Sequence, residues 1–505
     1  MTFIRQWILL AGLAWGWIGY DSSPAHAADP SASIADLEAA AAKGDPKAQT
    51  DLGVSFHQKA DYAQATKWFR LAADRGYAEA QSKLGWCYEF GQGLATNQAE
   101  AVVWYRRAAA QGLVKAQLNL ANCYYKGRGV ERNPTEAVKW FRQAAEQGLA
   151  GAQFNLGACL HLGEGVPRND AEAVLWFRQA ADQGYPEAQT ELGTCYLEGY
   201  GVKSDAGEAV KWFRLAAGKG YPLAQRRLGA CYLNGLGVKA DPVEAVKWLR
   251  EAAEQGDVAS QSNLGTCYLE GHGVSTNAVE AVKWFRRAAD QGWAVAQNNV
   301  AACYLDGRGV AKSNTEAIRW LRKAADQGLA EAQSKLGGLY YFGQGVKADF
   351  VESAKWYRKA AEQGFAKAQH NLGVCFLAGQ GVPRDPAEAV KWFRLAADQG
   401  YVEAQHNLGS CLLDGRGVKA DAVEAVKWFR LAAARSLPEA QRSLGRCYER
   451  GDGVGKDLVE SLQWYIRAAA QSDPEAAQGR DRLLKLLSPS QIADANRRAA
   501  APAPK

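Results

Sequence analysis

The chain has 505 residues, of which 52 are glycine, 17 tryptophan and 10 cysteine. Hydrophobic residues make up 48% of it and charged residues 23%, a balance that supplies a packed core and excludes global disorder. The net charge of +6 is spread along the whole chain, whereas nucleic-acid-binding surfaces concentrate basic residues in patches or stripes. Composition therefore argues against a nucleic-acid-binding protein and against a multispanning membrane protein.

The N-terminus has the pattern of a secretory signal. A basic start ending at Arg5 precedes an apolar run from Trp7 to Tyr20, which is shorter than the ~20 residues that a membrane-spanning helix needs. The small residues of Ala25-His26-Ala27 then form a cleavage site. We expect residues 1–27 to be a signal peptide and residues 28–43 a lead-in. The mature protein would be periplasmic or secreted, without a stable membrane span. An uncleaved N-terminal anchor is the alternative.

One period of 36 residues runs through the chain. Tryptophan recurs at this spacing from Trp68 to Trp464, and all ten cysteines share a second register from Cys87 to Cys447, in which only Leu339 departs. A glutamate register runs from Glu100 to Glu460. Self-similarity at a fixed period of this length is typical of stacked repeat proteins. The chain therefore consists of about twelve copies of one unit.

Each copy reads as two helices separated by glycine turns, as residues 221–256 illustrate. Residues 222–233 carry apolar side chains at helical spacing, and Gly235-Leu-Gly237 ends that helix. Asp241 with Glu244 predicts a capping box at the start of the second helix, in which Asp accepts from a backbone amide and Glu reaches back. We predict an all-α fold: a right-handed α-solenoid of about twelve helix-turn-helix repeats of 36 residues.

Two features imitate ligand-binding motifs. The Gly-x-Gly element follows a helix rather than a strand, which argues against a nucleotide site. The tryptophan register could be a sugar-stacking ladder, but its alanine and phenylalanine neighbours at helical spacing favour a buried stripe.

Catalytic and metal-binding constellations are missing from the sequence. There is no Cys-x-x-Cys, His-Glu-x-x-His or Gly-x-Ser-x-Gly motif, and no serine is followed three residues later by lysine. His370 and His406 share a register, but equivalent atoms of stacked repeats lie roughly 8–10 Å apart, too far for one metal ion. We expect no enzyme activity, no cofactor and no metal site.

Two segments carry a family resemblance: Ala259-Ser-Gln-Ser-Asn-Leu-Gly-Thr-Cys-Tyr-Leu-Glu-Gly-His-Gly-Val274 and Glu280-Ala-Val-Lys-Trp-Phe-Arg-Arg-Ala-Ala-Asp-Gln-Gly292. They resemble Sel1-like repeats, relatives of the tetratricopeptide repeat, and the resemblance covers residues 44–472. The first copy lacks four residues and the Gly-x-Gly turn, as an atypical end repeat does. We expect a closing helix over residues 473–487 and a largely disordered tail over residues 488–505.

The resemblance implies a scaffold. Exported relatives act as adaptors in envelope signalling, host-factor binding and exopolysaccharide assembly, so we expect a protein or peptide partner. A scaffold for anionic polysaccharide or peptidoglycan fragments is the second hypothesis, and a β-lactamase-like or other acyl-transfer enzyme is the third. Some secreted relatives join two cysteines within each repeat. This chain has one cysteine per repeat, so buried free thiols are expected, with disulfides as the alternative.

A solenoid exposes an extended face built from its first helices. By the tetratricopeptide register, Ser82 and Lys83 point into this groove, and the register of Lys83 is asparagine in six other copies. We call these aligned asparagines the asparagine ladder. Their amide groups would hydrogen-bond either to the backbone of a bound peptide or to the neighbouring helix. The register of Ser82 varies most, from apolar to basic along the chain. The candidate partner-binding residues are His370, Asn371, His406, Asn407, Arg442 and Arg446, and a secondary apolar groove would comprise Trp86, Leu118 and Phe154.

The signal and the single cysteine register generate the first prediction. The exported protein should begin at Ala28 and, after denaturation without reductant, should present close to ten thiols to an alkylating reagent. Intact-mass spectrometry measures both. A mass lower by about ten hydrogens, with no alkylation, would replace the buried thiols with disulfides.

Overall fold

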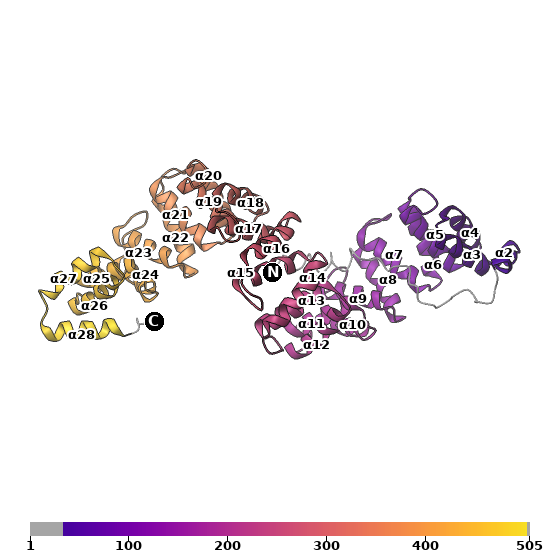
Figure 1. Cartoon of the computed structure of the whole chain (residues 1–505), viewed down its shortest axis with the longest axis horizontal. Coiled ribbons are helices and arrows are strands. Elements are labelled where there is room, and N and C mark those ends of the chain that lie inside the picture. The colour runs from indigo at the N-terminus through magenta and orange to yellow at the C-terminus, as the bar shows by residue number, and fades with distance from the viewer. Residues whose placement is uncertain (1–33, 502–505) are drawn as a thin grey trace. The chain divides into compact units, whose positions relative to one another are not determined.

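A computed structural model of the chain describes residues 34–501, which form helices and turns without any strand (Figure 1). The expected signal peptide, residues 1–27, lies outside the described residues, as does the lead-in up to residue 33. The remainder of the lead-in forms α2 (Ile34–Ala42). No helix within residues 34–501 is long and apolar enough to cross a membrane.

Twelve helix pairs follow α2 in the chain. The first helices of the pairs are α3 (Pro46–Gln58), α5 (Ala78–Phe90), α7 (Val114–Lys126), α9 (Ala150–Leu162), α11 (Pro186–Glu198), α13 (Pro222–Asn234), α15 (Val258–Glu270), α17 (Ala294–Asp306), α19 (Ala330–Phe342), α21 (Ala366–Ala378), α23 (Val402–Asp414) and α25 (Pro438–Arg450). The second helices are α4 (Tyr62–Asp74), α6 (Gln98–Ala110), α8 (Pro134–Glu146), α10 (Asp170–Asp182), α12 (Ala206–Gly218), α14 (Pro242–Glu254), α16 (Ala278–Asp290), α18 (Asn314–Asp326), α20 (Phe350–Glu362), α22 (Pro386–Asp398), α24 (Ala422–Ala434) and α26 (Leu458–Ala470).

The pairs divide into two compact units. Of the described residues, unit 1 contains those up to Ser260 with His272–Val274, and unit 2 contains Gln261–Gly271 with those from Ser275 onward. Apart from α15, which spans the boundary between the units, the two helices of a repeat pack on each other, and each second helix packs on the first helix of the next repeat. Each unit is therefore an all-α solenoid, as the 36-residue period predicts.

Only half of the predicted capping box forms. The Asp241 side chain accepts from the amides of Val243 and Glu244, at 3.1 and 3.0 Å. The backbone N–H of Asp241 donates instead to the carbonyl of Tyr232, at 2.9 Å, in the first helix of the same repeat. Glu244 is therefore free to bind Lys247, at 2.7 Å. The prediction that Glu reaches back is wrong here because the first helix already satisfies that donor.

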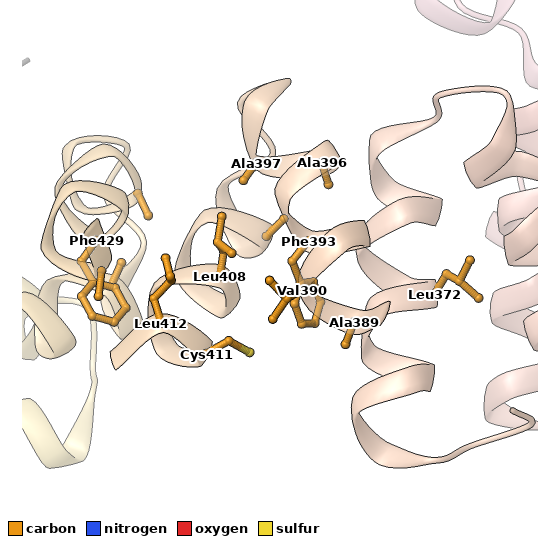
Figure 2. Close-up of a cluster of buried hydrophobic side chains, with 14 of the residues drawn as sticks. Leu372, Ala389, Val390, Phe393, Ala396, Ala397, Leu408, Cys411, Leu412 and Phe429 are labelled. Atoms are coloured by element: carbon orange, nitrogen blue, oxygen red, sulfur yellow. The ribbon is translucent and has the colours of Figure 1, made fainter. Parts of the chain in front are cut away.

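The core is a stripe of small and aromatic side chains between consecutive helices. Figure 2 shows one segment in unit 2, where Phe393 of α22 lies among alanines and faces Leu408 of α23. The residue directly after tryptophan belongs to this stripe, and Phe393 and Leu249 are fully buried there. The tryptophans themselves are buried or half-buried, so they belong to the packed stripe and form no exposed ladder.

The Gly-x-Gly turn serves the stacking of repeats. Gly235 ends α13 in the left-handed region at φ 67°, which glycine adopts without strain. Gly237 also has positive φ, and a Cβ there would lie 2.0 Å from the carbonyl oxygen of Ala206 in the preceding repeat. The second glycine therefore allows backbone contact between repeats, which accounts for its recurrence without any nucleotide.

All ten cysteines are buried free thiols, with exposed fractions of at most 3%. Burial raises their pKa, in Cys159 to about 12, because the apolar surroundings disfavour the thiolate. They contribute to the core as small apolar residues.

A buried glutamine of the first helix joins it to the helix before it, in eleven of the twelve repeats. The Gln369 amide donates to the carbonyl of Ala361, at 3.2 Å, in the last turn of the preceding second helix. Its oxygen accepts from Gln399, the C-cap of its own repeat, at 2.8 Å. The donation to alanine recurs at Gln49, Gln81, Gln117, Gln153, Gln189, Gln225, Gln297, Gln333, Gln405 and Gln441. We call this set the glutamine ladder.

The ladder is incomplete where the C-cap is basic. Arg435 donates to the carbonyl of Gly400, at 3.5 Å, and Lys219 donates to that of Gly184. The side-chain oxygens of Gln405 and Gln189, which would accept from a C-cap glutamine, are buried without a partner in the described part of the chain.

The C-terminal segment corrects one prediction. The expected closing helix is α27 (Pro474–Leu484), but the expected disordered tail contains a further helix, α28 (Pro489–Ala500). Ser488 and Gln491 form a capping box at its start. Arg498 pairs with Glu460 of α26 at 2.6 Å, and Ala495 is fully buried. The alanine-rich composition concealed this helix, although the Ser488-Pro489-Ser490-Gln491 signature marks its N-terminus.

The ladder generates the second prediction. Replacing Arg435 with the consensus residue (Arg435→Gln) should raise the free energy of unfolding by about 1 kcal/mol, the usual net value of one hydrogen bond, because Gln405 gains its missing donor. Urea unfolding and hydrogen exchange of α23 and α24 measure the change.

The matched variant is Gln399→Arg, which removes the donor to Gln369. It should lower the free energy of unfolding by about 1–3 kcal/mol, the cost of a buried unpartnered polar atom. Equal changes in both variants would show that the ladder does not set local stability.

Candidate functional site

The first helices carry the predicted site residues at two adjacent positions. We call the residue directly after the ladder glutamine the seam position, as in Leu118 or Arg442, and the next residue the face position, as in Asn407. Both lie on the side of the first helix that meets the neighbouring repeat, because seam residues contact side chains 31 and 37 residues further along the chain.

The predicted apolar groove is wrong for two of its three residues. Leu118 and Phe154 occupy seam positions and are each 4% exposed. The Phe154 ring packs on the rings of Tyr185, at 5.6 Å, and Phe177, at 5.9 Å. A large apolar seam residue is drawn into the core between repeats. Trp86 remains half-buried beside the exposed Phe90, with ring centroids 5.3 Å apart.

Four seam residues contact the residue 31 positions later, and in these pairs the chemistry matches. The His370 ring lies 5.3 Å from that of Tyr401. Arg226 pairs with Asp257, at 3.5 Å. In the last repeat Arg442 pairs with Asp473, at 3.4 Å, and also with Glu475, at 3.1 Å.

The pairing corrects the reason for choosing Arg442. The sequence predicts that Arg442 binds a partner, but two acidic side chains of the chain already offset its charge. Asp473 also accepts from the amide of Ala476, at 2.8 Å, and thereby caps α27. Arg442 is therefore a structural residue at the edge of the site.

The asparagine ladder is used between helices in unit 2. Asn407 donates to the ring nitrogen Nε2 of His370, at 2.9 Å, and His370 Nδ1 lies 3.2 Å from Asn371. Seam and face residues are joined in the same way at Asn298 and Lys335 (3.1 Å), and at His406 and Ser443 (3.2 Å). Of the two roles left open by the sequence, contact with the neighbouring helix is the one observed here.

A pocket in unit 2 brings together three of the predicted residues. Its walls come from α23 and the turn after it, α25 and α27, and consist of His406, Ser410, Asp414, Arg416, Arg442, Ser443, Arg446 and Glu475. Asp414 and Arg416 pair with each other at 3.1 Å. Arg446 is exposed and has no ion pair within residues 34–501. It is therefore the cation of the pocket that a ligand can engage.

His370, Asn371 and Asn407 do not line this pocket. Burial lowers the pKa of His406, and the neighbouring Arg442 and Arg446 lower it further, although Glu439 opposes them. The imidazole is neutral at pH 7, so the positive charge that faces a ligand comes from arginine.

Sequence reasoning missed Ser410 and Glu475. Ser410 occupies the register of Arg446 one repeat earlier, and Glu475 occupies the register of Glu439 one repeat later. The 36-residue period therefore continues into α27, and a search of the register beyond the last repeat could have found Glu475. Within the described residues, no group of three or more His, Cys, Asp or Glu side chains is placed to hold a metal ion.

These features define the class of protein: a tandem-repeat α-solenoid whose variable residues lie where repeats meet. The family model of the Sel1 repeat matches twelve consecutive segments, from residues 46–77 to residues 438–473. The chain belongs to the Sel1 repeat family, whose solenoids are scaffolds that commonly mediate protein interactions and are typically non-catalytic.

A solved structure of similar sequence supports this assignment. The chain is 34% identical to a protective antigen of uropathogenic Escherichia coli that has an SLR fold, with a TM-score of 0.66, over 93% of this chain and 94% of that one. It is 35% identical to a Sel1 repeat protein from Oxalobacter formigenes, with a TM-score of 0.49, over 61% of this chain and 90% of that one. A comparison with curated proteins gives no match.

The His370 contact generates the third prediction. Burial lowers the pKa of His370 below 6.5, and Nε2 must stay unprotonated to accept from Asn407. Between the folded and unfolded pKa values the unfolded chain binds more protons, so stability is full above pH 6.5 and is lost as the pH falls through the folded pKa. Thermal unfolding between pH 7.5 and pH 5 should show a smaller loss in His370→Asn, which places at this seam position the residue found at Asn298.

The control is His272→Asn, since His272 is exposed. It should keep the pH dependence of the unmodified protein. If the stability of His370→Asn depended on pH as that of the unmodified protein does, protonation of the His370 ring would not contribute to the loss of stability.

Proposed function

We propose that the chain is an exported, non-catalytic scaffold of the cell envelope that binds an acidic segment of a protein partner in the unit 2 pocket. The observation that carries the proposal is the exposed guanidinium of Arg446, which lies beside Arg442 and His406 and forms no ion pair with any residue that the structure describes.

The charge balance of the pocket favours a carboxylate ligand. Arg442 is offset by Asp473 and Glu475, and Arg416 by Asp414. Among the described residues of the pocket, Arg446 is the arginine left without an ion-pair partner, and arginine holds a carboxylate through paired hydrogen bonds. Ser410 and Ser443 on the same walls supply hydroxyl groups for the remaining oxygen or for a neighbouring peptide carbonyl.

Two observations support export. Residues 1–27 have the charge, apolar run and small-residue site of a signal peptide. The 34% identical relative is a protective antigen, a role that favours a protein exposed outside the cytoplasm. Periplasmic or secreted placement is consistent with both.

The fourth prediction tests the pocket with a fluorescent peptide rich in aspartate and glutamate. Arg446→Ala should weaken its binding to the mature protein at least tenfold, about 1.4 kcal/mol, without changing helicity. The loss should shrink as salt rises, because exposed charges are screened. Fluorescence anisotropy at low and high salt measures both effects.

The matched control is Arg450→Ala, one helical turn further along α25, where the side chain is exposed but outside the pocket. It should leave affinity within about twofold. Equal losses of affinity in both variants would show that the peptide is attracted by the general positive charge of α25 and not by the pocket. Capture of anionic polysaccharide, rather than protein, from an envelope extract by the unmodified chain would favour the glycan scaffold.

A further inference from the structure

Unit 1 contains a charged cluster that its own neighbours leave unsatisfied. Glu191, at the face position of α11, is only 8% exposed and makes no hydrogen bond or ion pair with any described residue. Arg227, at the face position of α13, lies within electrostatic range of Glu191, yet the two form no ion pair. The Nε atom of Arg227 is buried and unpartnered.

The contrast with unit 2 explains why Glu191 and Arg227 bond to no seam residue that the structure describes. In unit 2 a face residue bonds to the polar seam residue of the preceding repeat, as Asn407 bonds to His370. The seam residue that precedes Glu191 is Phe154, which offers no polar atom. The one that precedes Arg227 is Thr190, whose hydroxyl donates to Pro186 of its own helix, at 2.8 Å.

A second carboxylate lies on the same face. Glu187 is one helical turn before Glu191 on α11 and is half-buried without an ion pair in residues 34–501. The nearby Arg226 is already paired with Asp257. With Glu187 and Glu191 ionised, the cluster of these two side chains and Arg227 carries a net charge of −1, which one cation would neutralise.

We propose that Glu187 and Glu191, with Arg227 beside them, bind the ammonium group of a lysine side chain in an extended segment of a partner protein. The carboxylates accept from the ammonium group, and the Arg227 guanidinium donates to a backbone carbonyl of the same segment. This site lies in unit 1 and does not depend on the pocket of Arg446.

The energetic cost of burying an unpaired carboxylate at Glu191 is consistent with a site that binds a cation. A buried charge is costly unless it is paired, and burial raises the pKa of Glu191 to about 7 although Arg227 opposes the shift. The groups that interact electrostatically with Glu191 are Arg227, Cys195 and Tyr221. A bound ammonium group would favour the ionised carboxylate, so binding should strengthen as the pH rises from 6 to 8.

The fifth prediction uses a lysine-containing decapeptide and the same peptide with its lysines acetylated, each titrated into the full mature protein by calorimetry. Glu191→Gln should weaken binding of the lysine peptide at least tenfold and remove the rise in affinity between pH 6 and pH 8. The acetylated peptide should bind weakly to both proteins. Glu191→Gln should also unfold at a higher urea concentration, because it removes a buried unpaired charge.

The matched control is Glu198→Gln, on the exposed end of the same helix. It should leave affinity and pH dependence unchanged. Equal binding of the acetylated and unmodified peptides, or full affinity in Glu191→Gln, would overturn the proposal and leave Glu191 as a strained structural residue. Arg446→Ala should bind the lysine peptide normally, so failure of this site and failure of the acidic-segment pocket are distinguishable.

Discussion

The glutamine ladder is the interaction on which the remaining structure depends. A buried primary amide must satisfy both its donor and its acceptor, since an unpartnered buried polar atom costs about 1–3 kcal/mol. Gln369 meets this requirement by joining the end of α20 to the C-cap of α22, so it fixes the distance between one repeat and the next. Few other side chains reach both partners. The ladder therefore holds the register constant and leaves variation to the seam and face positions directly after it.

Variation at the seam changes the chemistry between repeats without changing their geometry. The same position holds a ring pair at Phe154 and Tyr185, and an ion pair at Arg442 and Asp473. In each case the partner lies 31 residues later, where the next first helix begins. A basic or aromatic seam residue is therefore no sign of a ligand until its partner is known, and Arg446, which lies outside the seam, is the better indicator of a site.

The period of 36 residues was sufficient to predict the helices, the turns and the burial of the cysteines, because each copy repeats the same local signals. It did not predict contacts between positions of different registers. Arg442 and Asp473 look like isolated charges until the helices are stacked, and Leu118 and Phe154 look exposed on a helical wheel of one repeat. α28 was missed for another reason: its stability comes from packing on α26 through Ala495 and Arg498, which its alanine-rich composition does not reveal.

Local stacking also explains how the fold tolerates Glu191. In a repeat protein each unit contacts only its neighbours, so the cost of one unsatisfied charge stays within two or three repeats and does not accumulate in a common core. Glu191 and Arg227 lack the bond from face residue to preceding seam residue that Asn407 makes with His370. The glutamine ladder on either side of them is retained at Gln153 and Gln225. The backbone scaffold is thus independent of the polar residues at the face position. A binding site can be built there by two substitutions in adjacent repeats, at an energetic cost that a bound partner would offset.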